Sequence, residues 1–373
     1  MILNKLTVNN FKNIRSASLE FSPKMNCFLG NNGMGKSNLL DAVHYLSFCR
    51  SFSGLTDQRL VTDGERFLML QGDYLRHDVP EDVQASYDAG KKKVFKRKGK
   101  VYKRLSEHIG LFPLVLVAPH DIDLINGTSE ERRRFIDQII SQSDARYLDS
   151  LIRYNHLLEQ RNRMLRDHIT DRALFEAVEL PMSAAAAYVS NARKGWIDDF
   201  MPVFNRYYAA IAGMEKPENV AMAYSTTIVP GYPLSLVGEF DKNRQRDEAV
   251  GHTTAGVHRD DIEMMLNGLP VRRMASQGQC KTYLIAMRFA QYDFLRRATG
   301  MYPLMLLDDI FDRLDAGRVE RIVAMVSGEE FGQTFITDTN LAHLDSIITR
   351  LKGDHRLFAV ESGEFRVVSD SEN

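Results

Sequence analysis

Cysteines are scarce in this chain, which has only Cys27, Cys49 and Cys280 among its 373 residues. Their wide, irregular spacing fits neither a zinc site nor a disulfide framework, so we expect reduced thiols in a cytoplasmic protein. The chain also lacks a run of about 18 apolar residues, the length that a membrane-spanning helix needs. No basic segment followed by an apolar one begins at Met1, so no secretory signal is expected. These absences argue against disulfide-stabilised secreted domains and against membrane proteins.

An excess of charge of one sign is absent as well, because the formal net charge is −1. Any contact with DNA must therefore come from a local basic patch. Nine of the fourteen residues in the range 91–104 are basic, with aromatic residues between them. This run fits a surface that binds DNA phosphates and equally fits the solvated rim of a hairpin that turns at Gly99. No base-reading module is present, so sequence-specific recognition is not expected.

The pattern of apolar residues changes along the chain, and the length allows two to three domains of about 150 residues each. Alternating apolar residues predict strands before residue 30 and between residues 66 and 118. From Thr128, which can form a capping box with Glu131, apolar residues recur at helical spacing to about residue 212. After Ser276 the pattern predicts helix, strand, helix and strand in turn.

A glycine-rich segment between a short apolar strand and an amphipathic helix carries the strongest functional signal. It fits the G-x-x-x-x-G-K-S pattern of a phosphate-binding loop and comprises Gly30, Asn31, Asn32, Gly33, Met34, Gly35, Lys36 and Ser37. The glycines let backbone N–H groups turn towards phosphate oxygens, and the following helix adds its positive dipole end. We expect Lys36 to neutralise the β- and γ-phosphates of ATP and the Ser37 hydroxyl to ligate Mg²⁺.

An apolar strand over residues 304–307 ends in two adjacent carboxylates, Asp308 and Asp309. Buried strands often run into acidic turns, but beside a phosphate-binding loop the pair predicts a site for magnesium and water. Asp308 would hold Mg²⁺, and Asp309 would act as a general base or orient water. The predicted catalytic residues are therefore Asp308, Asp309 and Lys36, and the predicted metal ligands are Ser37 and Asp308.

A third motif, over residues 276–279, precedes a helical stretch and lies about 30 residues before the acidic strand. A serine and a glycine at a helix start can bind an anion or simply cap the helix. The order of the three motifs resembles that of ABC ATPases, in which the signature of one subunit covers the γ-phosphate held by another. The resemblance implies that Ser276, Gly278 and Gln279 contact the nucleotide, with Gln277 in place of the usual first glycine.

Other ABC segments follow the same order. Residues 311–315 match a D-loop, which implies a contact of Asp315 across a dimer. Residues 335–339 match the switch segment but contain no histidine, so the resemblance implies slow hydrolysis, with the switch role at Asp338 or Thr339. Residues 119–121 take the place of the Q-loop.

Three local motifs resemble those of the RecF family of SMC-like ABC ATPases. Residues 10–14 are similar to an opening motif in which Lys12 and Asn13 approach the nucleotide. Residues 127–137 and 254–261 match two further motifs, with Ser129 and Val257 where prolines are usual. Read without the resemblance, residues 132–134 fit a solvated helix face, and residues 258–261 fit a strand end with a local ion pair of little energetic weight.

The RecF resemblance extends from residue 2 to about residue 360 and implies an α/β fold. This fold is an ABC/SMC-type P-loop ATPase head with a mainly helical second lobe. Residues 1–125 plus 300–373 would form the ATPase lobe, and residues 126–299 the helical lobe with the signature. The interval of about 270 residues between Lys36 and Asp308 contains no sustained heptads, so no long coiled coil is expected.

The resemblance also implies an ATP-dependent DNA-binding protein of recombinational repair and replication-fork maintenance, active in the SOS response to DNA damage. Two copies would dimerise on DNA when ATP binds, with a weak, DNA-stimulated ATPase acting as a nucleotide switch. The DNA would be single-stranded or a junction of single strand and duplex, and the partners would be recombination mediator proteins that help load the strand-exchange protein at gaps. The alternative is the ATPase subunit of another machine, either a transporter or an SMC-like structural complex.

Overall fold

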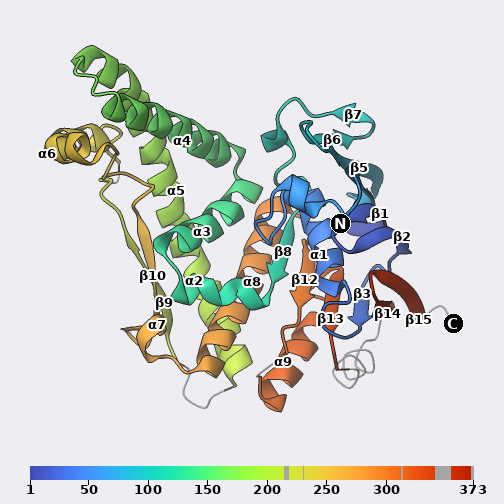
Figure 1. Cartoon of the computed structure of the whole chain (residues 1–373). Coiled ribbons are helices and arrows are strands. Elements are labelled where there is room, and N and C mark those ends of the chain that lie inside the picture. Colours follow the sequence, from blue (N-terminus) through green and yellow to red (C-terminus); the bar gives the residue numbers. More distant parts are fainter. Residues whose placement is uncertain (214–217, 230, 312–313, 341–353, 371–373) are drawn as a thin grey trace. The chain divides into compact units, whose positions relative to one another are not determined.

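A computed structural model describes the chain except for residues 214–217, 230, 312–313, 341–353 and 371–373. The chain divides into two compact units (Figure 1). The first unit comprises Met1–Asp121, Ala210–Gly213 and Leu284–Asn373, and the second comprises Ile122–Ala209 and Met214–Tyr283. This division assigns residues 284–299 to the first unit, whereas the sequence placed them in the helical lobe, and the lobe limits remain a prediction.

The N-terminal strands of the first unit form an antiparallel sheet, because their alternating apolar residues give each strand one buried face. In spatial order the strands are β2 (Ile14–Glu20), β1 (Ile2–Phe11), β4 (Phe67–Arg76), β5 (Val79–Asp88), β6 (Val94–Arg97) and β7 (Lys100–Val101). Leu6 and Val8 of β1 are fully buried, and Leu6 pairs with Leu19 of β2. The β6–β7 hairpin turns at Lys98 and Gly99, which confirms the predicted turn.

A second sheet of the first unit is parallel except at one edge. Its spatial order is β15 (Glu364–Asp370), β14 (His355–Glu361), β3 (Met25–Leu29), β13 (Thr334–Asp338), β12 (Leu304–Asp308) and β8 (Leu114–Val117), and only β15 runs antiparallel to its neighbour. Its interior strands are almost continuously apolar because both faces are buried. The carboxyl ends of β3, β8, β12 and β13 therefore meet at one edge, where polar residues follow each strand.

Helix α1 (Lys36–Phe48) connects the two sheets, since it packs against β1 and β4 of one and against β8, β12 and β13 of the other. Leu39, Leu40, Val43 and Leu46 are all fully buried, as their helical spacing predicted. The other helical elements of this unit are η1 (Asp57–Leu60), η2 (Leu105–Glu107) and α9 (Ala316–Val326), with η3 (Pro119–Ile122) at its boundary.

The second unit is mainly helical. Its helices are α2 (Asp123–Asn126), α3 (Ser129–Ser143), α4 (Ala145–Arg166), α5 (Arg172–Ala212, whose end lies in the first unit), α6 (Ser235–Val250) and α7 (Val271–Met274). A small antiparallel sheet contains β11 (Leu269–Pro270), β10 (Asp261–Leu266) and β9 (Val220–Ser225). Helix α8 (Gln277–Thr299) begins in this unit and continues into the first. Thr128 and Glu131 form the predicted capping box of α3.

Most of the predicted elements are present, and the α/β class is confirmed. Helix α6 and the C-terminal hairpin of β14 and β15 were not predicted. All three cysteines are buried free thiols, as expected. Among the described residues, no helix is long and apolar enough to cross a membrane.

Candidate functional site

The glycine-rich loop joins β3 to α1 at the edge where the parallel strands end. Gly35 caps α1 with a φ of 114°, a conformation that a side chain would strain. The Lys36 ammonium turns back onto the loop and donates to the carbonyl oxygens of Gly30 and Asn31, at 2.5 and 2.9 Å. Burial lowers the pKa of Lys36, while the carboxylates of Asp309 and Asp308 oppose this shift. The loop therefore holds a cation close to the backbone groups that would face an anion.

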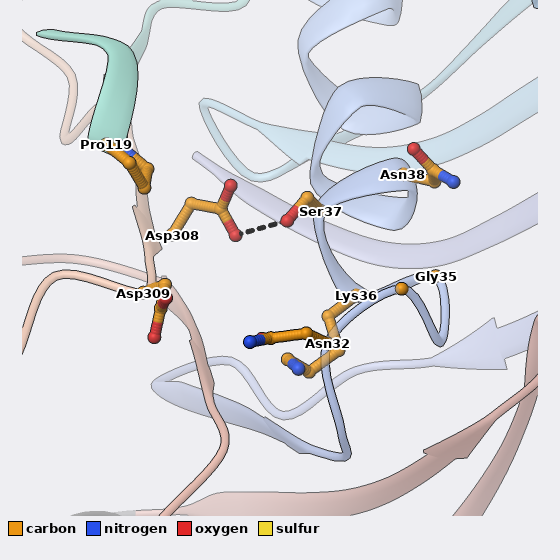
Figure 2. A pocket seen from close by; sticks show the side chains of 9 residues that line it. Asn32, Gly35, Lys36, Ser37, Asn38, Pro119, Asp308 and Asp309 are labelled. Carbon is orange, nitrogen blue, oxygen red and sulfur yellow. Dashed lines mark hydrogen bonds between the residues drawn. The ribbon is translucent and has the colours of Figure 1, made fainter. Parts of the chain in front are cut away.

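The Asp308 carboxylate receives two hydroxyl groups on one oxygen. Ser37 Oγ donates to Asp308 Oδ1 at 2.8 Å (Figure 2), and Thr337 Oγ1 donates to the same atom at 2.7 Å. Burial raises the pKa of Asp308, and these two hydrogen bonds counteract that rise. The second carboxylate oxygen has neither hydroxyl as its partner and remains available to a ligand on that side.

Asp309 adopts a backbone conformation that is unusual for a residue other than glycine, with a φ of 48°. Its backbone N–H donates to Thr337 Oγ1 at 3.0 Å. Thr337 thus binds both acidic residues, one through its hydroxyl hydrogen and the other through its hydroxyl oxygen. Strained backbone of this kind is concentrated at functional sites, where the surrounding structure maintains it.

A pocket of about 160 Å³ lies between the loop and the acidic strand end. Figure 2 shows Lys36 and Asn32 on one side of it and Asp308, Asp309 and Pro119 on the other. The described residues that line it are Asn32, Gly33, Gly35, Lys36, Ser37, Asn38, Pro119, Asp308 and Asp309. All of them belong to the first unit. The structure therefore brings together the two motifs that the sequence predicted to share a site.

Other residues of the predicted nucleotide site lie behind this lining. Lys12 forms an ion pair with the buried carboxylate of Asp41, at 2.5 Å, and is not among the lining residues. Asn13 contacts the loop more directly, because its side-chain oxygen accepts a hydrogen bond from Asn38 at 2.7 Å. Gly30, Asn31 and Met34 also contribute to the loop without lining the pocket.

The signature residues form a reciprocal cap at the start of α8, in the second unit. Ser276 Oγ accepts the backbone N–H of Gln279 at 3.2 Å, and the Ser276 N–H donates to Gln279 Oε1 at 2.8 Å. Gln279 also donates to Glu218 Oε1 at 2.6 Å. The Gly278 carbonyl accepts the hydroxyl of Thr282. Ser276 itself is exposed, so its hydroxyl is open to solvent while Gln279 is largely occupied within the chain.

The predicted D-loop, switch and Q-loop residues have different environments. Asp315 is the N-cap of α9, and the backbone N–H of Arg318 lowers the pKa of this exposed carboxyl. Asp312 and Arg313 lie outside the described residues. Asp338 is buried and accepts the N–H of Asn340 at 2.8 Å, whereas Thr339 is exposed.

In the Q-loop segment only Pro119 lines the pocket. Asp121 is buried and accepts hydrogen bonds from the Arg288 guanidinium and from the backbone N–H of Ala118. The ring of His120 stacks on Phe52, with 5.6 Å between the ring centroids. Asp121 therefore has a structural role in this unit.

Thr337 and Asn38 are the two site residues that sequence reasoning missed. The resemblance to a switch segment indicated Asp338 or Thr339 and not Thr337, the residue before them. Its position at the end of β13, paired with Asp308 on the parallel strand β12, could have indicated its role. Asn38 follows the loop motif directly, and no spacing rule singles it out.

The RecF-like motifs of the second unit lie in a network of buried ion pairs. Arg132 binds Asp261 through two hydrogen bonds of 2.8 and 3.0 Å, and its side chain is 11% exposed. Arg133 donates to the Asp260 carbonyl at 2.6 Å. The interpretation of residues 132–134 as a solvated helix face is therefore wrong for Arg132 and Arg133. It holds for Arg134, which pairs with Glu130 at the surface.

Two fully buried arginines extend this network. Arg193 of α5 binds Asp137 of α3 and Asp260, and the Tyr224 hydroxyl also donates to Asp260. The interpretation of residues 258–261 as a minor local ion pair is therefore also wrong.

Arg161 of α4 binds Glu179 at 2.9 Å, Asp247 at 2.7 Å and Thr253 at 2.8 Å. These residues come from different helices and loops, so the charges connect the elements of the unit. This network and the motifs within it are structural rather than part of the pocket.

A metal ion at the pocket would have few protein ligands. Among the described residues, no group of three or more histidine, cysteine, aspartate or glutamate side chains could hold one. Ser37 and Asp308 offer two hard oxygen donors side by side. This set fits Mg²⁺, which is usually bound by one or two carboxylates together with phosphate oxygens and water.

The chain is similar over its full length to curated bacterial proteins. The model of the family described as "RecF/RecN/SMC N terminal domain" matches residues 2–352. A protein of Parabacteroides distasonis named "DNA replication and repair protein RecF" is 47% identical over 370 residues, which cover 99% of this chain and 100% of that protein. A protein of the same name from Porphyromonas gingivalis is 48% identical over 98% of this chain and 99% of its own length. The predicted resemblance is confirmed.

Solved structures agree with this assignment. A structure described as the recombination mediator protein RecF with ATP in the RecFOR pathway has a TM-score of 0.88 at 27% identity, and covers 99% of this chain and 98% of its own. An Smc head domain from Pyrococcus furiosus has a TM-score of 0.58 at 16% identity, over 98% and 96% of the two chains. The latter likeness concerns the fold alone. Together these structures confirm an ABC/SMC-type ATPase head.

Proposed function

The chain belongs to the RecF family of DNA replication and repair proteins, and on this premise we propose that ATP closes two copies of it on DNA. The observation that carries the proposal is the composition of the pocket. Its described lining supplies a phosphate-binding loop, a lysine and two carboxylates, but no signature residue. In ABC ATPases the signature of a second subunit completes the site. Ser276 and Gly278 of a second copy would therefore cover the γ-phosphate.

Lys36 and the loop amides would hold the β- and γ-phosphates. In the structure, Lys36 donates to two loop carbonyls, so it can exchange these neutral acceptors for charged phosphate oxygens without crossing the pocket. A charge-assisted hydrogen bond is about twice as strong as a neutral one, which favours the exchange. Asn32 and Asn38 lie on the same lining and offer side-chain amides to the nucleotide.

Ser37 and Asp308 would hold Mg²⁺, and Thr337 would fix the carboxylate orientation. When bound, the metal would neutralise charge on the transferred phosphoryl group. Asp309 is placed to orient water or accept its proton, because it lines the pocket and Thr337 holds its backbone. Slow turnover agrees with the lack of a histidine in residues 335–339, the segment where ABC ATPases have a switch histidine, with Asp338 or Thr339 in its place.

The basic run around β6 and β7 would supply part of the DNA contact. Five of its nine cations have a carboxylate partner within 4 Å, and these are Lys91, Lys93, Arg97, Lys98 and Arg104. Within the part of the chain that the structure describes, Lys92, Lys96, Lys100 and Lys103 form no such ion pair. These four lysines can bind phosphates without giving up a carboxylate partner, whereas each of the other five would exchange a carboxylate for a phosphate.

The similar RecF structures are described as a recombination mediator in the RecFOR pathway. We infer that this chain likewise acts with mediator proteins at single-stranded gaps or junctions, where it helps load the strand-exchange protein. Such a role needs binding that does not depend on base sequence, and contacts to phosphates provide it.

The composite pocket can be tested by the mass of the protein in solution with and without ATP. We expect the wild type to dimerise only with ATP, and Lys36→Arg to remain monomeric because it binds phosphates poorly. Ser276→Arg should bind ATP normally yet remain monomeric. An equal mixture of the two variants should recover some dimer, because one of the two pockets in the mixed pair is intact. Dimerisation of Ser276→Arg at the wild-type level would overturn the proposal.

The DNA contact can be tested by measuring affinity across a salt series. Lys96→Ala with Lys100→Ala should reduce the slope of log affinity against log salt by about 2 for each bound copy, since each phosphate contact contributes roughly 0.9. Lys91→Ala with Arg104→Ala removes the same charge from cations that already have carboxylate partners, and should change the slope much less. Equal slopes for the two double variants would exclude the proposed surface.

A further inference from the structure

The C-terminal hairpin, formed by β14 and β15, has no role in the site described above. We propose that its turn, Ser362-Gly363, is a positioning element that holds the phosphate-binding loop in its nucleotide-binding shape. This inference rests on the proposed binding of ATP to that loop. Three sets of contacts within the first unit join the hairpin to the loop.

First, the hairpin is joined to the strand that delivers the loop. β14 pairs in parallel with β3 along its length, and Ala359 lies opposite Leu29, the last residue of β3. The next residue, Gly30, opens the loop. A Cβ atom on Gly30 would overlap the carbonyl oxygen of Val360, so the backbones approach too closely for any side chain. The hairpin therefore fixes the start of the loop.

Second, the turn binds the middle of the loop. The backbone N–H of Gly363 donates to the Met34 carbonyl oxygen at 2.7 Å. The neighbouring N–H of Ser362 points at the Met34 sulfur, at 3.4 Å. Met34 is the residue between Gly33 and Gly35, and these glycines give the loop its tight turns. The hydrogen bond from Gly363 thus orients the peptide group between Met34 and Gly35, in the middle of the loop.

Third, the same turn packs on the β1–β2 hairpin, which supports the other side of the loop. A Cβ atom on Gly363 would overlap the carbonyl oxygen of Asn13. Asn13 in turn lies within 3.0 Å of the position of a Cβ atom on Gly35, and it accepts a hydrogen bond from Asn38. Two hairpin turns, one from each end of the chain, therefore enclose the loop.

The backbone of the turn is suited to this task. Ser362 and Gly363 have φ values of 50° and 84°, as in the two-residue turns that match the twist of paired strands. Such a turn leaves its N–H groups in a fixed direction. Since a phosphate site requires its donors to be placed within about 0.5 Å, loss of the turn should weaken nucleotide binding without removing any group that touches ATP.

The first test compares two glycines in equivalent turns. Gly363→Ala should weaken ATP binding by the full-length protein, without DNA, by about tenfold or more because the methyl group displaces the turn. Gly99→Ala is the matched control: Lys98-Gly99 has φ values of 50° and 72°, but nothing lies within 4 Å of a Cβ atom there. Both variants carry the same backbone strain, so their difference in ATP affinity isolates the contact with the loop.

A second pair of variants keeps the test valid if Gly363→Ala does not fold. Ser362→Asn suits a positive φ and should retain wild-type affinity, whereas the β-branched Ser362→Val should lose several-fold. Backbone strain should lower the thermal midpoint of Ser362→Val without nucleotide, so the readout for each variant is the further stabilisation produced by added ATP.

Wild-type affinity for ATP in both Gly363→Ala and Ser362→Val would overturn the inference while leaving the proposed function intact. If the wild type itself bound no ATP, the proposed function would fail first. If Gly99→Ala lost as much affinity as Gly363→Ala, backbone strain rather than contact with the loop would be responsible, and the inference would be wrong.

Discussion

The phosphate-loop pocket of the first unit and the arginine network of the second differ in the partners of their charged side chains. In the pocket, Lys36 has only neutral partners among its hydrogen bonds, and Asp308, which also lines it, accepts hydrogen bonds from two neutral hydroxyls. In the network, Arg161 and its two carboxylates are at most 1% exposed, and the guanidinium pairs with both of them.

This difference separates binding chemistry from scaffolding. A charged side chain with neutral partners is stabilised further when a ligand of opposite charge binds. A charged side chain that is already paired and buried would have to give up its ion pair to bind such a ligand. We therefore expect the pocket to bind an anion and a metal, and the network to hold its helices together.

The largest effect is expected in the network. Arg161→Met removes the cation and leaves Glu179 and Asp247 buried without it, which should destabilise the protein by about 3–5 kcal/mol. Trp196 is the only tryptophan and is buried in the second unit, so its fluorescence in a urea titration reports the loss. The ATP affinity of the folded protein should not change. A loss of ATP affinity at unchanged stability would mean that the network takes part in nucleotide binding and is not only structural.

Arg134→Met is the matched control, since Arg134 and Glu130 form an exposed pair within one helix. Pairs of this kind contribute about 0.3–0.5 kcal/mol, so Arg134→Met should hardly change the free energy of unfolding. A cost similar to that of Arg161→Met would mean that burial does not decide the effect.

The next effect is expected in the pocket. Asp309→Asn should lower the rate of ATP hydrolysis about 100-fold, because the amide cannot accept a proton from water. ATP binding and the urea midpoint should remain near those of the wild type, since the backbone contact with Thr337 is retained. Phosphate release and nucleotide titration measure the two quantities separately. An Asp309→Asn protein that hydrolyses normally would remove this residue from the catalytic role.

The sequence predicted the pocket better than the network, for a physical reason. A phosphate-binding loop is local, so eight consecutive residues specify its turn, its lysine and its hydroxyl. The acidic pair joins it because parallel strands end at one edge of a sheet. By contrast, the partners of Arg161 lie 18 and 86 residues away in the chain, and no local pattern reveals such pairing.

The contacts of the residues that surround the pocket could not be predicted from the sequence either. Lys12 was expected at the nucleotide, but Asp41 neutralises it in the folded chain. Ser362 and Gly363 gave no functional signal, because their contacts are backbone groups more than 300 residues from the loop in sequence. Thr337 was missed for a similar reason, since its importance comes from the strand beside it.

The smallest effect concerns a histidine of the network. His258 Nδ1 meets the Tyr154 hydroxyl at 2.6 Å, and its Nε2 meets the Thr253 carbonyl oxygen at 3.1 Å. Burial lowers the pKa of His258 from 6.5 to about 4, and the nearby Arg259 adds to this shift. The unfolded chain therefore takes up a proton at a higher pH than the folded one.

Stability should consequently fall as the pH drops from about 6.5 towards 4, by roughly 1–2 kcal/mol at pH 5. His258→Gln has no titrating ring, so its unfolding free energy should change less than that of the wild type between pH 7 and pH 5. His156→Gln, at an exposed position of α4, controls for the loss of a histidine. Urea titrations followed by Trp196 fluorescence at pH 7 and pH 5 give the change in unfolding free energy for each protein. If His258→Gln and the wild type lost equal stability between pH 7 and pH 5, proton uptake by His258 would not contribute to the acid sensitivity. The sensitivity would then come from other buried histidines, such as His44 and His108 of the first unit. Burial also lowers the pKa of each of these two to about 4.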